Sequence, residues 1–288
     1  MSPTLVRHQL PASGSMDGDE PPVAAGSRDR VRDWAEIQER MLVPLYEAAY
    51  DRLGVGAGSR LLGLGCGSGL ALLLAATRGA QVSGVDADEC RLELARERLT
   101  PGGGAEATRL VSGGLEAAAA GGAAFNVVTA FHPVGCGGSV EGLPAVLSAA
   151  AGLVERGSAV VLGGWGPVER CATAGVLRGA QRLADGPIDF AAGSAGWRLS
   201  GRDDLEELAE RAGLRPDGSG RVACPFGYAD MGSAVRGLLS TGLFDAALEG
   251  VEQRQVEKEL VEALHPYERA DGTVWMPNVF RYLIARTP

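Results

Sequence analysis

The sequence predicts an α/β protein with a doubly wound, mostly parallel sheet of seven strands, helices on both of its faces and a helical cap. Three observations favour this class. Short apolar runs alternate with helical stretches between residues 60 and 165, the turn after the first run is rich in glycine, and strand-like alternation returns near the C-terminus. Such alternation is typical of parallel sheets, which bind ligands beyond the carboxyl ends of their strands. Functional residues are therefore expected just after each strand.

Composition limits the classes of function. The chain has 288 residues, of which 45% are hydrophobic, enough for one domain with an elaborated cap. Its 27 basic and 36 acidic residues give a formal net charge of -9, and no basic run interrupts this balance, so a nucleic-acid partner is not expected. The sequence has no apolar stretch of membrane-spanning length, and its start lacks the apolar core of a signal peptide. We therefore expect a cytoplasmic protein without membrane contact.

The cysteine and histidine patterns argue against disulfides and metal. The five cysteines contain no CxxC pair, so we expect reduced, mostly buried thiols. The three histidines are far apart and share no neighbourhood with clustered cysteines, so no metal site is expected. These residues are Cys66, Cys90, Cys136, Cys171, Cys224, His8, His132 and His265.

The N-terminal part divides into a tail and a lid. Residues 1–27 carry Pro, Ser, Gly and Asp without a periodic apolar face, which predicts a disordered tail. In residues 28–53 apolar side chains recur at three- and four-residue steps, which predicts an amphipathic helix or a pair of helices broken near Pro44. This lid either covers a pocket or caps a sheet edge. Residues 28–288 as a whole are expected to form one domain.

From residue 60 onward, short apolar runs predict strands and longer amphipathic runs predict helices. Gly79 closes the first of these helices, and Asp88 is the candidate N-cap of the second. Strands are expected at residues 60–65, 80–86, 106–111, 125–131 and 158–165, and helices at residues 68–79, 88–99 and 141–157.

After residue 165 the alternation loosens. Residues 166–197 and 227–266 are the natural material for cap insertions. The second insertion contains a glutamate-rich helix at residues 250–264, which is either a solvated amphipathic helix or a contact within a homodimer or the cap. The remaining elements of the sheet layers are a helix at residues 201–214 and strands at about residues 220–226 and 273–285.

The stretch "RLLGLGCGSGLALLL", residues 60–74, carries the strongest motif. Its glycines fit neither a GxGxxG dinucleotide fingerprint nor a P-loop, and they leave GxGxG from Gly65 to Gly69. A strand, a glycine-rich turn and a helix bring backbone N–H groups close to a ligand. The next strand ends at Asp86, 21 residues after Gly65, where a carboxylate accepts both hydroxyls of a ribose. Alternatively, Asp86 is a solvated turn residue or shares the helix cap with Asp88.

Here the sequence resembles the class I S-adenosylmethionine-dependent methyltransferases. "RLLGLGCGSGLALLL" and "VSGVDADECRLELARERL" are similar to the first two βα units of that family. "AFNVVTAFHPV" resembles its fourth-strand motif, "LSGRDDLEELAERAGL" its late helix, and "DGTVWMPNVFRYLIAR" the ending of its actinobacterial small-molecule members. The resemblance covers about residues 40–288. It implies a Rossmann-like sheet with a late antiparallel hairpin, S-adenosylmethionine as cofactor and S-adenosylhomocysteine as product.

The resemblance also implies roles for individual residues. Gly65, Gly67 and Gly69 should approach the methionine portion of the cofactor, Asp86 should hold the ribose, and Ala87 should lie beside the adenine. Three positions, Gly63, Gly114 and Asn126, depart from the family, which usually has acidic residues there. The departures at Gly63 and Gly114 should each weaken cofactor binding about tenfold to hundredfold unless other groups substitute. The further residues expected at the cofactor are Cys66, Leu115 and Phe131.

A base is needed when the methyl acceptor is a hydroxyl group. His132 follows the fourth expected strand and is the candidate catalytic base, although it can equally line the pocket or cap the turn before Pro133. His265 and Tyr267 are weaker candidates. Aromatic side chains are expected to face an apolar acceptor, although they are core residues by default. The predicted substrate pocket comprises Trp165, Trp197, Tyr228, His265 and Tyr267, with Phe226 and Trp275 as further aromatic candidates.

Three functions remain open at this point. The first is methyl transfer to a small-molecule acceptor, a natural product or another metabolite. The second is a non-methylating reaction on the same fold, such as a cyclisation or rearrangement, with the cofactor retained as structure or charge. The third is a non-catalytic binding protein with a decayed cofactor site. Gly63 and Gly114 keep the second function open.

Overall fold

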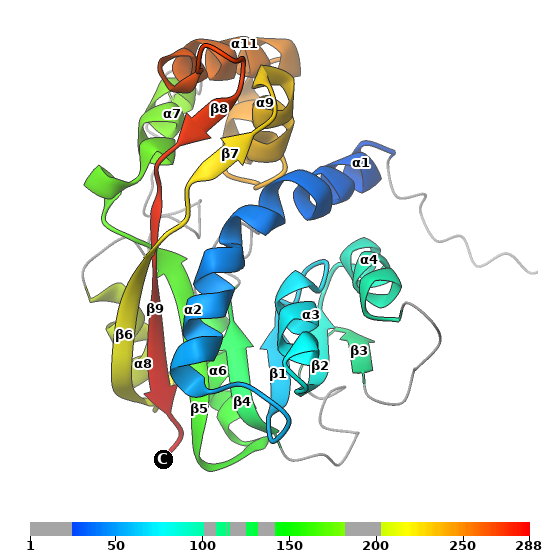
Figure 1. The fold of residues 1–288 in the computed structure, drawn as a ribbon, viewed down its shortest axis with the longest axis vertical. Helices are drawn as coiled ribbons and strands as arrows, with labels where there is room; N and C mark the ends of the chain where they lie inside the picture. The colour runs from blue at the N-terminus through cyan, green and yellow to red at the C-terminus, as the bar shows by residue number, and fades with distance from the viewer. Residues whose placement is uncertain (1–24, 101–107, 114, 116–124, 132–141, 182–202) are drawn as a thin grey trace, which may run out of the picture.

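The computed structural model describes residues 25–100, 108–113, 115, 125–131, 142–181 and 203–288 (Figure 1). Within them, seven strands form one sheet in the order β3-β2-β1-β4-β5-β9-β6. The first five of these pair in parallel, whereas β9 is antiparallel to both β5 and β6. The predicted doubly wound sheet with a late antiparallel hairpin is therefore confirmed. His132, Gly114 and Trp197 lie outside the described residues, as do Cys136 and most of the predicted tail.

The strands begin and end close to the predicted positions in the first half of the chain. The fifth strand starts earlier than predicted, because the helix before it ends at Ala151 and Val154 already pairs with Phe125. Gly152 follows that helix as its C-cap. The strands are β1 Arg60–Leu64, β2 Gln81–Asp86, β3 Thr108–Ser112, β4 Phe125–Ala130, β5 Val154–Trp165, β6 Arg215–Ala223, β7 Phe226–Tyr228, β8 Val274–Met276 and β9 Val279–Arg286.

The helices cover both faces of the sheet and build the cap. Helices α2 and α3 contact one face, and α6 and α8 contact the other (Figure 1). Asp88 caps α4 as predicted, because its side chain accepts hydrogen bonds from the backbone of Cys90 and Arg91. The helices are α1 Ala25–Asp33, α2 Val43–Leu53, α3 Leu70–Thr77, α4 Glu89–Leu99, α6 Leu143–Ala151, α7 Ala172–Gln181, α8 Asp204–Arg211, α9 Met231–Leu239, α10 Asp245–Gly250 and α11 Gln253–Leu264, with short 3-10 turns η5 Val168–Arg170 and η7 His265–Tyr267.

The last two predicted strands are each divided in two, which corrects the sequence analysis. Strands β6 and β9 belong to the main sheet, whereas β7 and β8 form a separate antiparallel pair. Pro225 and Pro277 lie at the two breaks, and proline has no N–H to donate to a ladder. The pair β7-β8 rises above the carboxyl ends of the parallel strands, where α7, α9 and α11 surround it (Figure 1). Parts of both predicted cap insertions thus lie together.

The N-terminal segment, residues 25–53, changes helix type twice. Helix α1 is followed by a π-helical turn, η1 Trp34–Gln38, and by a 3-10 turn, η2 Glu39–Leu42, before α2 begins. Pro44 lies in the first turn of α2, where its missing N–H costs nothing. The predicted break near Pro44 is confirmed.

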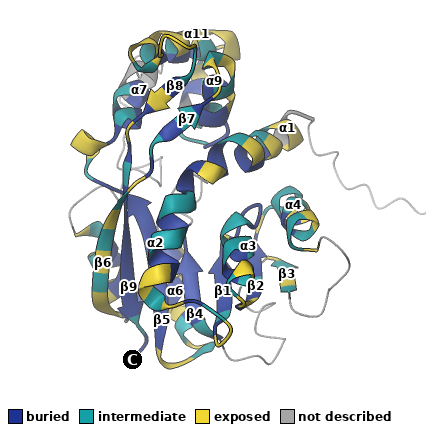
Figure 2. Cartoon of the chain, in the orientation of Figure 1, coloured by how far each residue is buried: buried dark blue, intermediate teal, exposed yellow. Residues whose placement is uncertain are grey.

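Buried side chains form two clusters, one on each face of the sheet. Figure 2 shows that the strands in the middle of the sheet are mostly buried. The larger cluster joins α2, α3 and the cap, and the smaller one joins β1, β4 and β5 to α6 and α8. Among the described residues, no helix is both long and apolar enough to cross a membrane.

Candidate functional site

A pocket lies where the strand order reverses, between β1 and β4 at their carboxyl ends. Open α/β sheets bind ligands at such a switch point. The N-terminal segment, the loop after β1, the start of α3 and the end of β4 all contribute to its wall, so the predicted lid contacts this pocket. Its lining includes Trp34, Glu39, Tyr46, Gly67, Leu72 and Phe131.

The loop between β1 and α3 leaves its backbone open toward this pocket. Gly67 has φ +56°, and a Cβ there would lie 3.6 Å from Glu39 Oε1 and 3.8 Å from Trp34 Nε1. Gly69 has φ +78°, and its Cβ would lie 2.9 Å from the Cβ of Ala95. Glycine at both positions avoids the strain that a side chain would suffer at positive φ. The absence of a side chain at Gly69 lets α3 approach α4. The absence of a side chain at Gly67 keeps open the space between the loop and the lid residues Glu39 and Trp34.

Asp86 closes β2 beside the glycine-rich loop, as the sequence predicts. Its Oδ2 accepts a hydrogen bond from the backbone N–H of Gly67 at 2.8 Å, and its Oδ1 accepts one from the N–H of Asp88 at 2.9 Å. The residue is only 8% exposed. A carboxylate offers about four lone-pair sites, so this one keeps acceptor capacity for the hydroxyls of a ligand while it fixes the loop.

The structure explains Gly63, the first departure from the family pattern. A Cβ on Gly63 would lie 2.9 Å from Leu72 Cδ2, and its partner in the sheet, Gly84, is equally crowded by Leu72 and Cys66. The paired glycines therefore make room for two side chains that pack down onto the sheet. A side chain at position 63 would therefore require Leu72 to change its position.

Asn126, another departure, lies away from the pocket. Its side chain accepts a hydrogen bond from the backbone N–H of Arg60 at 2.9 Å and donates one to the carbonyl of Gly58 at 3.0 Å. These bonds fix the start of β1 against the start of β4, at the opposite end of the strands. Asn126 thus holds strand register rather than a ligand.

A buried carboxylate from the lid faces the glycine-rich loop. Glu39 is 3% exposed. It accepts hydrogen bonds from the Ser68 hydroxyl and, at 2.6 Å, from Arg98 Nη1. Arg98 also donates to the carbonyls of Ser68 at 3.0 Å and Ala35 at 3.2 Å. Burial raises the pKa of Glu39, and the bonds from Ser68 and Arg98 oppose that rise. Arg98 thereby clasps the lid to the loop.

The sequence does not predict that Glu39 and Trp34 reach this pocket together, because the apolar repeat around them indicates a regular α-helix. In an α-helix residues five apart point away from each other, since each residue turns the chain by about 100°. Here the N–H of Glu39 donates to the carbonyl of Trp34, which is the bond of a π-turn and places the two residues one above the other. A charged residue inside an apolar repeat was the only available signal.

The other expected cofactor residues are placed as follows. Phe131 is buried at the end of β4, with its ring 4.8 Å from that of Tyr46. Ala87 is exposed beyond Asp86, and Leu115 packs against the smaller core cluster. Gly63, Gly65 and Cys66 line the pocket with Gly67. The structure gives the positions of these residues, whereas their contacts with a cofactor stay predictions.

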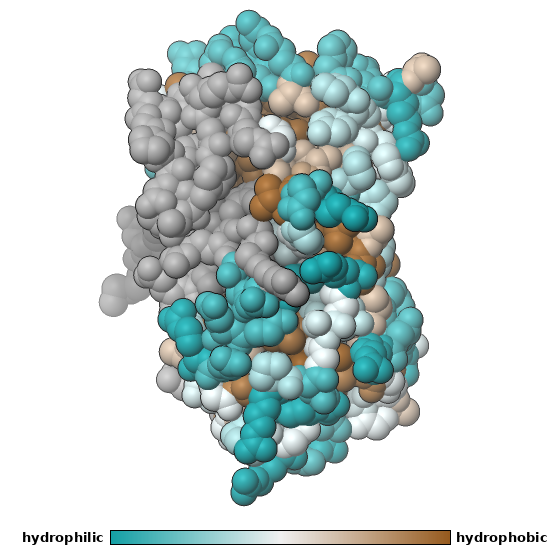
Figure 3. Space-filling view, turned by 90° about the vertical axis from the view of Figure 1, so that its left-hand side faces the viewer, coloured by the Kyte–Doolittle hydropathy of each residue, from teal (hydrophilic) through white to brown (hydrophobic). Residues whose placement is uncertain are grey.

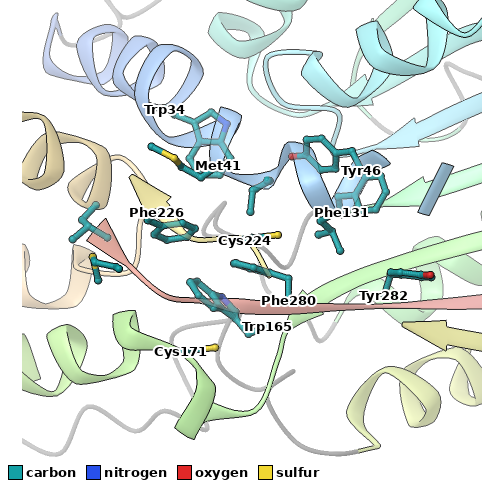
Figure 4. Close-up of a cluster of buried hydrophobic side chains, with 14 of the residues drawn as sticks. Trp34, Met41, Tyr46, Phe131, Trp165, Cys171, Cys224, Phe226, Phe280 and Tyr282 are labelled. Atoms are coloured by element: carbon teal, nitrogen blue, oxygen red, sulfur yellow. The ribbon is translucent and has the colours of Figure 1, made fainter. Parts of the chain in front are cut away.

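Of the predicted substrate residues, the four that the structure describes do not line this pocket. Trp165 and Tyr228 are buried, and Tyr228 donates its hydroxyl hydrogen to Gln38 Oε1 at 2.9 Å. His265 keeps 75% of its side chain exposed beside Glu268. Tyr267 packs partly buried against the larger cluster. Figure 4 shows Trp165 among Phe226 and Phe280, with Trp34, Met41 and Tyr46 approaching the same cluster from the lid.

Cys66 is expected to react slowly with thiol reagents despite its place in the loop. Burial, with a smaller contribution from the charge of Asp86, raises the pKa of its thiol to about 12, which leaves about one thiolate in ten thousand at pH 8. Iodoacetamide at pH 8, followed by peptide mass spectrometry, should label Cys66 only after unfolding, whereas the less buried Cys90 serves as the folded-state comparison. Equal labelling of the two in the folded chain would contradict this placement.

Comparisons with known proteins agree with this geometry. Residues 61–157 match the family model described as a methyltransferase domain. The fold is similar to the BH2331 protein of Bacillus halodurans C-125, with 15% identity, a TM-score of 0.52 and coverage of 84% of this chain and 98% of that one. It is also similar to YjhP of E. coli, with 20% identity, a TM-score of 0.50 and coverage of 90% of this chain and 99% of that one. A third similar structure is YcgJ of Bacillus subtilis, with 14% identity, a TM-score of 0.51 and coverage of 84% of this chain and 97% of that one.

None of the curated proteins matches this chain in sequence. The resemblance to class I methyltransferases is nonetheless confirmed, because the matched segment contains the glycine-rich loop and Asp86 and the sheet has the order expected of that fold. Residues 61–157 thus match a methyltransferase domain, and the described sheet has the corresponding fold. The actinobacterial subtype stays a prediction.

Proposed function

We propose that the chain transfers a methyl group from S-adenosylmethionine to a small-molecule acceptor. One observation carries this proposal: a glycine-rich loop lines the pocket at the strand switch point, and the carboxylate of Asp86 accepts a hydrogen bond from the Gly67 N–H of that loop, within the segment that matches a methyltransferase domain. Backbone N–H groups at such a turn and the start of a helix bind polar ligand groups without side chains.

The residues present fit this cofactor. Asp86 keeps acceptor capacity for ribose hydroxyls, and Ala87 is exposed just beyond it, where an adenine would lie. The indole nitrogen of Trp34 is buried and has no hydrogen-bond partner among the described residues, so a polar ligand group in the pocket would satisfy it. When bound, S-adenosylmethionine supplies a methyl group on a sulfonium, whose leaving group is already good.

The chain's own task is then alignment and exclusion of water. Tyr46 and Phe131 form an apolar aromatic wall at the end of β4, and fixed orientation of reactants accounts for much of the rate of a displacement. His132 follows this wall in the sequence and stays the proposed base for a hydroxyl acceptor.

A small acceptor suits the surface of this protein. The formal net charge of -9 repels nucleic acid. On the face drawn in Figure 3, apolar residues show in the middle of the molecule between hydrophilic ends. An acceptor bound near the lid and the cap would meet apolar side chains there.

The test is transfer of a labelled methyl group. The chain is incubated with methyl-labelled S-adenosylmethionine and a panel of phenols, amines and enolisable ketones, and S-adenosylhomocysteine is quantified. We expect its formation to depend on both the chain and one acceptor class. Cofactor binding without transfer to any acceptor would favour the non-methylating alternative, and absence of binding would favour a decayed site.

A further inference from the structure

The lid places two polar groups in the pocket through one turn of π-helix. Trp34 is 4% exposed, and its Nε1 has no hydrogen-bond partner among the described residues. Glu39 lies one π-turn later and is 3% exposed. Both approach Gly67 closely, since a Cβ on that glycine would lie within 4 Å of each. A buried donor and a buried carboxylate therefore face the same loop.

Glu39 is held firmly in this position. Ser68 and Arg98 both bond to its Oε2. Its Oε1 is the atom nearest to the missing side chain of Gly67. Because Arg98 also binds the carbonyls of Ala35 and Ser68, the carboxylate and the loop keep a fixed relation. Such rigid placement is what recognition of a small charged group requires.

The size of the cavity decides which part of a ligand fits there. Its volume is about 30 Å³, which suffices for roughly two water molecules. An ammonium or a carboxylate fits in this space beside Trp34 and Glu39. The nucleoside would lie toward Asp86 and the exposed Ala87. The part of the pocket between the loop and the lid would take the amino-acid end of the cofactor, which carries one ammonium and one carboxylate.

Strand β1, Arg60–Leu64, contains no acidic residue, and Gly63 packs against Leu72 instead. Resting on the proposed function, we infer that two side chains one π-turn apart, those of Trp34 and Glu39, bind the amino-acid end of S-adenosylmethionine. Glu39 accepts hydrogen bonds from the ammonium, and the Trp34 indole N–H donates one to the carboxylate. The lid thus supplies the recognition that β1 lacks.

The experiment compares two ligands that differ only in this end. S-adenosylhomocysteine has the amino-acid group, whereas 5′-methylthioadenosine keeps the adenosine and thioether without it. Binding of both is measured by titration calorimetry for the unaltered chain, Glu39→Gln and Trp34→Phe. Glu36→Gln is the matched control, because Glu36 belongs to the same turn and its side chain is 69% exposed.

We expect Glu39→Gln and Trp34→Phe to weaken S-adenosylhomocysteine binding at least about tenfold while 5′-methylthioadenosine binding changes less than about twofold. Glu36→Gln should change neither. Equal loss of both ligands in the two variants would overturn the inference, since it would mean that the turn only supports the loop. Unchanged affinity for both ligands would also overturn it. If the unaltered chain binds neither ligand, the proposed function itself fails.

Discussion

Replacing Asp86 with alanine is expected to weaken binding of S-adenosylhomocysteine at least about tenfold. In the structure the carboxylate anchors the N–H groups of Gly67 and Asp88, and in the proposed function its remaining lone pairs accept the ribose hydroxyls. A hydrogen bond to a charged group contributes roughly 1.5–3 kcal/mol. The variant loses both kinds of bond, and titration calorimetry against the unaltered chain measures the result.

Asp88→Ala is the matched control for this prediction. Asp88 lies two residues away, but its side chain caps α4 through Cys90 and Arg91. Loss of an N-cap costs about 0.5–2 kcal/mol of stability, so this variant should unfold more easily and bind the ligand as before. Unaltered affinity in Asp86→Ala, measured beside it, would mean that the cofactor site has been placed wrongly.

Trp165→Ala is expected to lower the free energy of unfolding by about 3–5 kcal/mol. Trp165 is 1% exposed, and its ring centroid lies 4.3 Å from that of Phe280 and 5.9 Å from that of Phe226. Truncation would leave a cavity that these neighbours cannot fill. Urea denaturation followed by circular dichroism gives the free energy.

Trp275→Ala provides the comparison, because Trp275 is 41% exposed and its ring packs between Arg269 and the backbone of Gly227. A cation–π contact of this kind is worth about 0.5–1 kcal/mol. Trp275→Ala should therefore lower the free energy of unfolding several times less than Trp165→Ala does. A stable Trp165→Ala variant that loses only turnover of an acceptor would show that Trp165 contacts substrate, as the sequence analysis proposes, and would contradict its role as a core residue.

Local patterns were sufficient to predict most of the sheet. The alternation of apolar runs and helical stretches predicted β1 to β4. Asp88 and Pro44 indicated helix starts, because a capping carboxylate and a proline in the first turn act only on residues a few positions away. Asp86 was placed beside the loop for the same reason: parallel strands end at one edge, so residues that follow them meet. Such features follow from the chain's local chemistry.

Features that depend on tertiary packing could not be predicted. The π-turn that brings Trp34 beside Glu39 has no periodic signature, since the residues around it repeat as in an ordinary helix. The reason for Gly63 is Leu72, nine positions later, and their contact arises only when α3 packs on the sheet. The same holds for Pro225 and Pro277, which divide two strands and create the pair β7-β8 within the cap.

The central claim is that this pocket and its lid hold S-adenosylmethionine. A crystal structure of the chain grown with millimolar S-adenosylhomocysteine tests it most directly. The account predicts the ribose hydroxyls within hydrogen-bond distance of Asp86 and the amino-acid end against Glu39 and Trp34. Ligand bound elsewhere, or a ribose that does not contact Asp86, would contradict it.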